Sequence, residues 1–580
     1  MPEDQPVSRR VFLGKAATLG VAGAVAPLAV GVSRAATPES AAALPAGPAV
    51  PRALSVQDIQ GAERVAGVTF TPSQREAMLE PLEDRLEVLE DLHAAESPNS
   101  LIPAQRFDPQ IAGDRPRPPQ PHPEWTPQPA TRPSSLEDLA FQPVHVLASL
   151  LRSRQVTSTE LTQLYLERLK HYDSVLHCVV NLTEERALAQ ARAADAELDA
   201  GLWRGPLHGV PWGAKDLLSV RGYPTTWGAT PFKDQVIDDD ASVVERLDAA
   251  GAVLLAKLTT GALAWGDVWF GGKTLNPWNI EQGSSGSSAG PGSAVAAGLV
   301  GFAIGSETLG SIVSPSTRNA VSGFRPTFGR ISRAGAMTLS WSLDKLGPMC
   351  RSAFDCALVF DAVHGQDDRD PSSLDADFAW PLPVKPSRVR IGYVADAFEG
   401  DFSGAESDRA VLDVLRSLGF DPQPMAWPDV PTGGPMLALG AETAAAFDEL
   451  SRTGGTDSMV SQQLWPSSFR EARFITAVDY VNGQRQRTRL MHAVSEVMAD
   501  YDVIVTNHRR NGLSITNLTG HPSVTVPNRL DPIENAPESG RRRTDAINFI
   551  GGLYQDDVTL AVAHAYQTAT DFHLQRPPIK

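Results

Sequence analysis

Hydrophobic residues recur along this chain in two patterns, at three- or four-residue spacing in some segments and in short continuous runs elsewhere. The first pattern predicts a helix opening at the capping sequence Thr157-x-x-Glu160 and another at residues 184–200, before Gly201. Residues 175–180 and 503–505 are short apolar runs typical of buried strands. Such elements alternate with glycine-rich loops from about residue 134 to 365, which predicts an α/β fold.

An N-terminal extension of residues 36–133 precedes this α/β region. Residues 72–96 have a helical pattern, interrupted or restarted at Pro81, with leucines at helical spacing that predict a docking face. Residues 102–133 carry many prolines and are expected to form an extended strap or linker. Periodicity weakens again at 370–470, which we interpret as a variable insertion.

The first 35 residues have the parts of an export signal. Paired arginines at Arg9-Arg10 precede Phe12-Leu13 and an apolar, Ala/Gly-rich run, and Ser33-Arg34-Ala35 offers small residues for cleavage. The pattern resembles a twin-arginine signal peptide and predicts a periplasmic or extracellular enzyme. A retained membrane anchor is the alternative, although the run is short for a bilayer.

Charge and cysteine content exclude several classes of function. The formal net charge of −17 disfavours binding to nucleic acid or to an anionic membrane, both of which need positive patches. The three cysteines show no metal-site spacing, so no metal is expected. A disulfide between Cys350 and Cys356 stays open, with buried free thiols as the simpler expectation.

Three segments carry residues that could take part in a chemical reaction. In chain order they are Gly209-Val210-Pro211-Trp212-Gly213-Ala214-Lys215-Asp216, Gln282-Gly283-Ser284-Ser285-Gly286-Ser287-Ser288-Ala289-Gly290 and Gly305-Ser306-Glu307-Thr308-Leu309-Gly310-Ser311-Ile312. The two Gly/Ser segments let backbone N–H groups approach a ligand closely, which suits an oxyanion. A phosphate loop would need a Lys-Ser/Thr pair after its glycines, and none follows here. Burial of Lys215 at the end of an apolar run would lower its pKa, so that it could act as a base.

This combination closely resembles the amidase signature family, which has a Gly-Val-Pro-x-x-x-Lys-Asp strand end, a Gly-Gly-Ser-Ser-Gly-Gly-Ser loop and a Thr-Asp-Thr-Gly-Gly-Ser-Ile loop. Flanking segments match as well: Asn276-Pro277-Trp278-Asn279, Ala294-Val295-Ala296-Ala297-Gly298 and Gly323-Phe324-Arg325-Pro326-Thr327. The resemblance implies a catalytic domain of residues 134–580, with a large mixed central β-sheet covered by helices on both faces. It also implies hydrolysis of a linear amide to a carboxylate and ammonia or amine, without cofactor or metal.

The resemblance assigns catalytic roles to three side chains. Ser311 matches the nucleophile that forms an acyl-enzyme, and Lys215 matches the general base, neutral in the free enzyme. The family's bridging serine, which follows a cis peptide bond, matches Ser287 rather than Ser284, because Ser287 stands 24 residues before Ser311. Aligning the run at residues 294–298 gives the same choice.

The same resemblance places an oxyanion hole in the third segment. Backbone N–H groups of Thr308, Leu309, Gly310 and Ser311 are expected to form it, and Ser288 is expected in binding. The expected partner is a small-molecule amide, and a homodimer is compatible with the sequence.

Departures from the family pattern affect the substrate and the oxyanion hole. Glu307 replaces the usual Asp and Leu309 a usual Gly, which would tilt the oxyanion loop. Val313 stands where many members carry an arginine, which in some grips a substrate carboxylate. A small acid-bearing substrate is therefore disfavoured.

Three other interpretations stay open. Residues 286–290 also satisfy the Gly-x-Ser-x-Gly elbow of α/β-hydrolases, with Ser288 as nucleophile and His521 as base. A Gly/Ser loop before that elbow and Pro291-Gly292 after it argue against the required strand–turn–helix. The A subunit of a tRNA-dependent amidotransferase has the same triad, but works in the cytoplasm with partner subunits. A non-catalytic binding protein on the same fold is the third alternative.

Overall fold

The helices form where the sequence supplies caps. In a computed structural model of the chain, α6 (Ser158–Leu176) begins after Thr157, whose hydroxyl accepts the N–H group of Glu160 at 3.0 Å. The predicted second helix is α7 (Glu184–Asp199), and Gly201 follows it at a φ of +82°. The structure describes residues 53–95, 98–110, 115–122, 125–507, 512–534 and 537–579, which belong to one compact unit. The expected signal segment, residues 1–35, lies outside these ranges.

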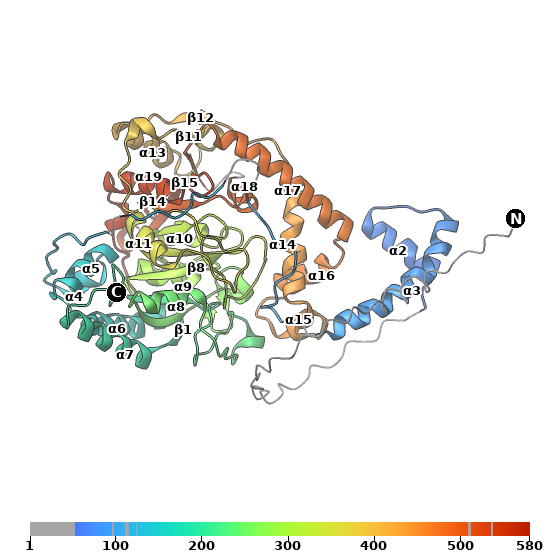
Figure 1. Cartoon of the computed structure of the whole chain (residues 1–580), viewed down its shortest axis with the longest axis horizontal. Coiled ribbons are helices and arrows are strands. Elements are labelled where there is room, and N and C mark those ends of the chain that lie inside the picture. The colour runs from blue at the N-terminus through green and yellow to red at the C-terminus, as the bar shows by residue number, and fades with distance from the viewer. Residues whose placement is uncertain are drawn as a thin grey trace, which may run out of the picture. The chain divides into compact units, whose positions relative to one another are not determined.

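Eleven strands form one mixed sheet (Figure 1). Across the sheet the order is β1 (Val179–Leu182), β3 (Val253–Leu258), β2 (Pro211–Lys215), β8 (Phe302–Glu307), β10 (Lys345–Cys350), β9 (Ser322–Arg325), β14 (Ser523–Pro532), β15 (Arg542–Gly551), β13 (Val503–Thr506), β11 (Ile391–Val394) and β12 (Gln423–Met425). β2 pairs in parallel with β3 and β8, whereas β10 pairs antiparallel with β8 and β9. Every residue of β3, β8 and β10 is buried, so both faces of this part of the sheet are covered, as expected.

The helices lie around a large continuous hydrophobic core. Besides α6 and α7 they are α4 (Leu136–Ala140), α5 (Val144–Arg152), α8 (Ser242–Ala249), α9 (Ala289–Ala296), α10 (Val313–Asn319), α11 (Ala353–Val363), α12 (Ala395–Phe398), α13 (Ala405–Ser417), α14 (Gly433–Ala446), α15 (Asp448–Arg452), α16 (Trp465–Ala472), α17 (Ala477–Met498), α18 (Gly512–Thr519) and α19 (Asp556–Thr568). Of these helices, α6, α7, α9, α10, α11, α13 and α19 contact strands of the central sheet directly. The long helix α17 lies along α14 (Figure 1). Residues 370–470 contribute β11 and β12 to the central sheet itself.

The start of the helix after the serine loop differs from the expectation. α9 begins at Ala289, directly after Ser288, although Pro291 was expected to delay a helix. Proline is tolerated there because N–H groups of the first helical turn have no partner inside the helix. Nearer the C-terminus, Asn517 lies in α18, which ends before Gly520 at a φ of +82°.

The predicted strand at 175–180 was also placed too early. α6 continues to Leu176, and His177 ends it with a left-handed φ of +49°. The strand β1 follows at Val179–Leu182. An apolar run at the junction of a helix and a strand has no periodicity that separates the two.

The described part of the N-terminal extension contains two helices and a strap. α2 (Val56–Ala66) is joined to α3 (Pro72–Ala94) by an ion pair of 2.6 Å between Glu63 and Arg75. α3 runs through Pro81 unbroken, and the proline is exposed, so water can replace the hydrogen bond that it removes. The described residues from 98 to 134 contain neither helix nor strand, which confirms the expected extended strap.

Two further expectations were tested in the described residues. Cys178, Cys350 and Cys356 are buried free thiols, so the open disulfide is not formed. Within the described ranges, no helix combines the length and apolar character needed to cross a bilayer.

Candidate active site

Strand β2 carries Lys215 into the interior at its carboxyl end. The strand is buried throughout and lies between β3 and β8. The Lys215 side chain is fully buried, and its Nζ lies within hydrogen-bonding distance of the hydroxyl oxygens of Ser287 at 2.8 Å, Ser306 at 2.8 Å and Ser288 at 3.1 Å. A weaker contact of 3.4 Å joins Nζ to the Ser306 carbonyl. The amine is therefore surrounded by serine oxygens.

This environment changes the charge of the amine. Burial lowers the pKa of Lys215 well below its usual value, and the negative charges of Asp344 and Glu307 only partly oppose that shift. Lys215 is thus favoured in its neutral form, which has a lone pair able to accept a proton.

A second buried lysine shows the contrast. Lys257 Nζ lies 2.8 Å from Asp216 Oδ1, and both side chains are fully buried. Asp216 also accepts the N–H group of Thr226 at 3.0 Å. Burial lowers the pKa of Lys257, while Asp216 acts to raise it. The Lys257–Asp216 pair fixes the chain directly after Lys215 without placing a carboxylate on the Lys215 amine.

The serine loop presents Ser287, and not Ser284, to the lysine. The peptide bond between Gly286 and Ser287 is cis, as the family resemblance implies. A Cβ at Gly286 would lie 1.8 Å from the Gly266 carbonyl oxygen, so this position must be glycine. The Ser284 hydroxyl instead donates to the backbone carbonyls of Ser285 and Ala289.

Ser288 links the serine loop to β8. Its buried hydroxyl donates to the Ser306 carbonyl and accepts the Ser306 N–H group, both at 3.1 Å, in addition to its contact with Lys215. Its backbone N–H donates to the Ser311 carbonyl at 3.2 Å. Ser288 therefore holds the second and third segments together, and its expected contact with a ligand stays a prediction.

Ser311 lies at the turn between β8 and α10, and is 9% exposed. In the described part of the chain its hydroxyl makes no hydrogen bond, including none with Ser287. The carbonyl contact with Ser288 nevertheless brings the two loops together. Catalytic hydrogen bonds are often long before substrate binds.

The turn before Ser311 offers unpaired backbone donors. Among the described residues, no backbone or side-chain acceptor takes the N–H groups of Thr308, Leu309, Gly310 or Ser311. Gly310 has a φ of +83°, a left-handed conformation that favours glycine. Unpaired N–H groups in a tight turn are the donors that an oxyanion hole needs.

Glu307 fixes this turn from behind. Its Oε2 accepts the N–H groups of Ile312 at 2.8 Å and Val313 at 3.0 Å, while Oε1 accepts from Arg325 at 2.7 Å and Asn517 at 2.8 Å. Burial acts to raise the pKa of Glu307, but Arg325 and Lys345 outweigh it and lower the pKa to about 2. The two N–H groups that follow the candidate oxyanion hole are therefore already hydrogen-bonded to this carboxylate.

Two contacts of the site were missed in the sequence. Ser306 precedes Glu307 and contacts Lys215, and Asp344 Oδ1 accepts the Thr308 hydroxyl at 2.6 Å. Burial raises the pKa of Asp344. The register of β8 and β10, which pairs Glu307 with Lys345, brings Asp344 to the turn. A lone aspartate far along the chain gives no signal of this proximity.

The structure disfavours the elbow interpretation. The strand before the serine loop, β7 (Asn279–Gly283), belongs to a separate two-stranded sheet. His521 Nδ1 hydrogen-bonds to Thr519 at 2.7 Å, and burial lowers its pKa to about 3. In the described residues no cluster of three His, Cys, Asp or Glu side chains could hold a metal ion.

Comparison with known proteins agrees with this geometry. The Amidase family model matches residues 160–509. The A subunit of glutamyl-tRNA(Gln) amidotransferase from Methylococcus capsulatus is 32% identical over 74% of this chain and 97% of its own. A putative amidase, AmiD, from Mycobacterium bovis is 31% identical over 75% of this chain and 95% of its own.

A solved structure extends the likeness to three dimensions. The peptide amidase of Stenotrophomonas maltophilia superposes with a TM-score of 0.64 at 28% identity, covering 76% of this chain and 98% of its own. Sequence match, sheet and site lead to one conclusion: the chain belongs to the amidase signature family.

Proposed function

We propose that this amidase uses Ser311 as nucleophile, Ser287 as proton bridge and Lys215 as base. The observation that carries the proposal is the buried Lys215 amine at 2.8 Å from Ser287 Oγ, in surroundings whose burial lowers its pKa. Ser287 gives its proton to Lys215 and takes the proton of Ser311, whose oxygen attacks the amide carbon. Backbone N–H groups of residues 308–311 stabilise the oxyanion, each contributing about 3 kcal/mol in the transition state.

The reaction closes with return of the protons. Lys215 gives its proton back through Ser287 to the leaving nitrogen, and the C–N bond breaks to release ammonia or an amine. Water then attacks the acyl group on Ser311 and passes a proton through Ser287 to Lys215. The bond between the acyl carbon and Ser311 Oγ breaks, that oxygen takes the proton back by the same route, and the product leaves and ionises to the carboxylate. No step uses a metal ion, so a chelator is expected to leave the rate unchanged.

The direct test is ammonia release by the purified protein alone from a panel of aliphatic, aryl and peptide amides. Turnover without ATP, tRNA or partner subunits supports a self-sufficient hydrolase. Glutaminase activity that appears only with partner subunits would instead support an amidotransferase A subunit, the function of one relative. Binding of amides without any turnover would indicate a binding protein.

We also propose that the enzyme is exported, on the paired arginines and apolar run of residues 1–35. Replacing Arg9 and Arg10 with lysines should retain the protein in the cytoplasm. Equal export of both forms would contradict a twin-arginine route. The homodimer that the sequence allows is tested by light scattering of the purified chain.

A further inference from the structure

A cavity of about 470 Å³ borders the candidate catalytic turn. Ser306 and Thr308, which contact Lys215 and Asp344, form part of its wall. Most of the remaining wall is apolar, and is made by Ile102, Leu217, Trp227, Met337, Leu339 and Trp341. A cavity of this size beside the turn can hold the apolar part of a small ligand.

One wall of this cavity comes from the N-terminal extension. Pro98, Asn99, Ser100 and Ile102 line it, although the family model begins only at residue 160. Asn99 anchors this segment: its Oδ1 accepts the Thr338 N–H group at 2.7 Å, and its Nδ2 donates to the Thr338 carbonyl at 2.8 Å. The strap thereby adds a wall from outside the matched region of the chain.

The anchored wall connects to the candidate oxyanion turn. Asp344 Oδ2 accepts the N–H groups of Leu339 at 2.8 Å and Ser340 at 2.9 Å, just after Thr338. Asp344 Oδ1 accepts the Thr308 hydroxyl. The strap, the loop after Thr338 and the turn at Thr308 thus form one connected wall.

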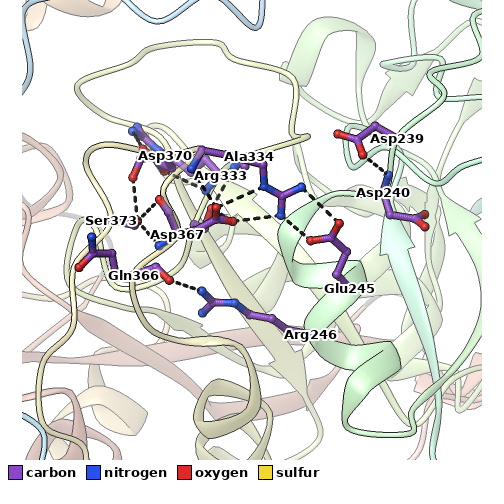
Figure 2. Close-up of polar contacts among 12 residues, drawn as sticks. Asp239, Asp240, Glu245, Arg246, Arg333, Ala334, Gln366, Asp367, Asp370 and Ser373 are labelled. Carbon is purple, nitrogen blue, oxygen red and sulfur yellow. Dashed lines mark hydrogen bonds and ion pairs between the residues drawn. The ribbon is translucent and has the colours of Figure 1, made fainter. Parts of the chain in front are cut away.

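The arginines of the wall are already paired within the protein. Figure 2 shows Arg333 facing Asp370, with two contacts of 2.9 and 3.0 Å between its guanidinium and both carboxylate oxygens. Arg369 is paired with Glu245 and lies 3.1 Å from Asp367. A ligand carboxylate would have to compete with these carboxylates for either guanidinium.

The acids of the wall are engaged as well. Asp344 accepts three hydrogen bonds, and Asp239 accepts the N–H group of Asp240 at 3.0 Å and lies 3.8 Å from Arg221. A charged ligand group would lose its hydration without gaining a counter-ion. The cavity therefore favours neutral groups.

We infer that residues 98–102 form a specificity wall that limits the size of the substrate and selects neutral amides bearing an apolar group. This inference rests on the proposed amidase function and adds a substrate class to it. Ile102 contributes an apolar side chain to the wall, whereas its neighbour Leu101 is 59% exposed and does not line the cavity. The two residues provide a test variant and a matched control.

The test compares Ile102→Ala, Ile102→Trp and Leu101→Ala on acetamide, isobutyramide, phenylacetamide and 4-phenylbutyramide. In Ile102→Ala, the ratio of kcat/KM for 4-phenylbutyramide to kcat/KM for acetamide should rise about tenfold, because KM for the larger amide falls. In Ile102→Trp, the same ratio should fall. Leu101→Ala should match the wild type. If kcat/KM changed equally for all four amides, or if neither Ile102 variant changed the ratios of kcat/KM between amides, the proposed specificity wall would be refuted.

Charged analogues test the second half of the inference. Succinamate and protonated 4-aminobutyramide should give kcat/KM at least about tenfold below that of the neutral amide of equal length. Equal rates would contradict selection for neutral groups. Calorimetric titration of the same amides into Ser311→Ala protein measures their affinity without turnover. The titration is made with Ile102 intact and with Ile102→Ala or Ile102→Trp added. Size-dependent affinity without wild-type turnover would refute hydrolysis and keep the wall, whereas turnover without size dependence would refute only the wall.

Discussion

The amine of Lys215 lies 2.8 Å from the hydroxyl of Ser287, inside a site where its other near partners are serine oxygens. The equally buried amine of Lys257 lies at the same distance from the carboxylate of Asp216. Burial alone therefore does not distinguish the two lysines. The hydroxyl surroundings of Lys215 remove the direct counter-ion, which makes this lysine the one suited to accept a proton.

Replacing each candidate nucleophile with alanine, one at a time, distinguishes the amidase signature mechanism from the elbow mechanism of an α/β-hydrolase. Ser311→Ala should lower kcat by at least about 10⁴-fold, because the attacking oxygen is lost. Ser288→Ala should retain measurable turnover, reduced about 10- to 100-fold, because it loosens only the contacts with Lys215 and Ser306. Ammonia release measures both, and circular dichroism checks folding. The reverse order of the two losses would identify Ser288 as the nucleophile.

The two serine pairs of the loop provide a second matched comparison. Ser287→Ala should lower kcat about 10³-fold, because the proton path from Ser311 to Lys215 is broken. Ser284→Ala removes only contacts with backbone carbonyls, and should keep kcat within about tenfold. Steady-state kinetics on one amide suffices. A larger loss in Ser284→Ala would move the bridge to that serine.

The pH dependence should report the ionisation of Lys215. Its pKa is lowered by burial, so the active neutral amine is present well below the usual lysine range. The kcat/KM value should therefore rise from acidic to mildly alkaline pH as the amine loses its proton, and then level off. A profile that falls across this range would contradict a lysine base.

Loss of the Lys215 amine provides the matching mutational test. Lys215→Ala should have little activity at any pH, since within the described residues no other base contacts Ser287. Lys257→Ala is unsuitable as a control because it would leave Asp216 without its buried partner. Arg132→Ala, on the exposed strap, serves as the charge control and should keep the wild-type profile.

Acid stability should depend on Glu307. Its pKa is lowered from 4.5 to about 2, so the folded protein binds this proton less tightly than the unfolded chain. The resulting stabilisation, about 3 kcal/mol, is complete above pH 4.5 and is lost as the pH falls towards 2. Glu307→Gln should lose it at neutral pH, whereas Glu307→Asp keeps the charge.

Denaturant unfolding of the three proteins between pH 7 and 3 measures this effect. The difference in unfolding free energy between wild type and Glu307→Gln should narrow as the pH falls. A difference that stays constant with pH would show that the charge of Glu307 does not stabilise the fold. A lower kcat in Glu307→Gln, with KM little changed, would indicate that Glu307 positions the candidate oxyanion turn through its hydrogen bonds with the N–H groups of Ile312 and Val313.

Local patterns predicted the parts of this protein that depend on nearby residues. The capped start of α6 at Thr157 and the end of α7 before Gly201 are determined by hydrogen bonds and backbone conformation within one turn. The choice of Ser287 over Ser284 came from spacing, and the structure places Ser287 against Lys215. Local patterns failed at Pro81 and Pro291, where position in the helix, rather than proline itself, decides the outcome.

The sequence by itself determined the family, the α/β fold and the three candidate catalytic positions, because each is encoded in a short segment. Only the tertiary structure decided that Ser306 and Asp344 join the site, that Glu307 fixes the oxyanion turn, and that residues 98–102 wall the cavity. Asn99 and Thr338 lie far apart in the chain, yet hydrogen-bond directly. Such contacts arise from strand register and packing of the whole chain, to which no local pattern is sensitive.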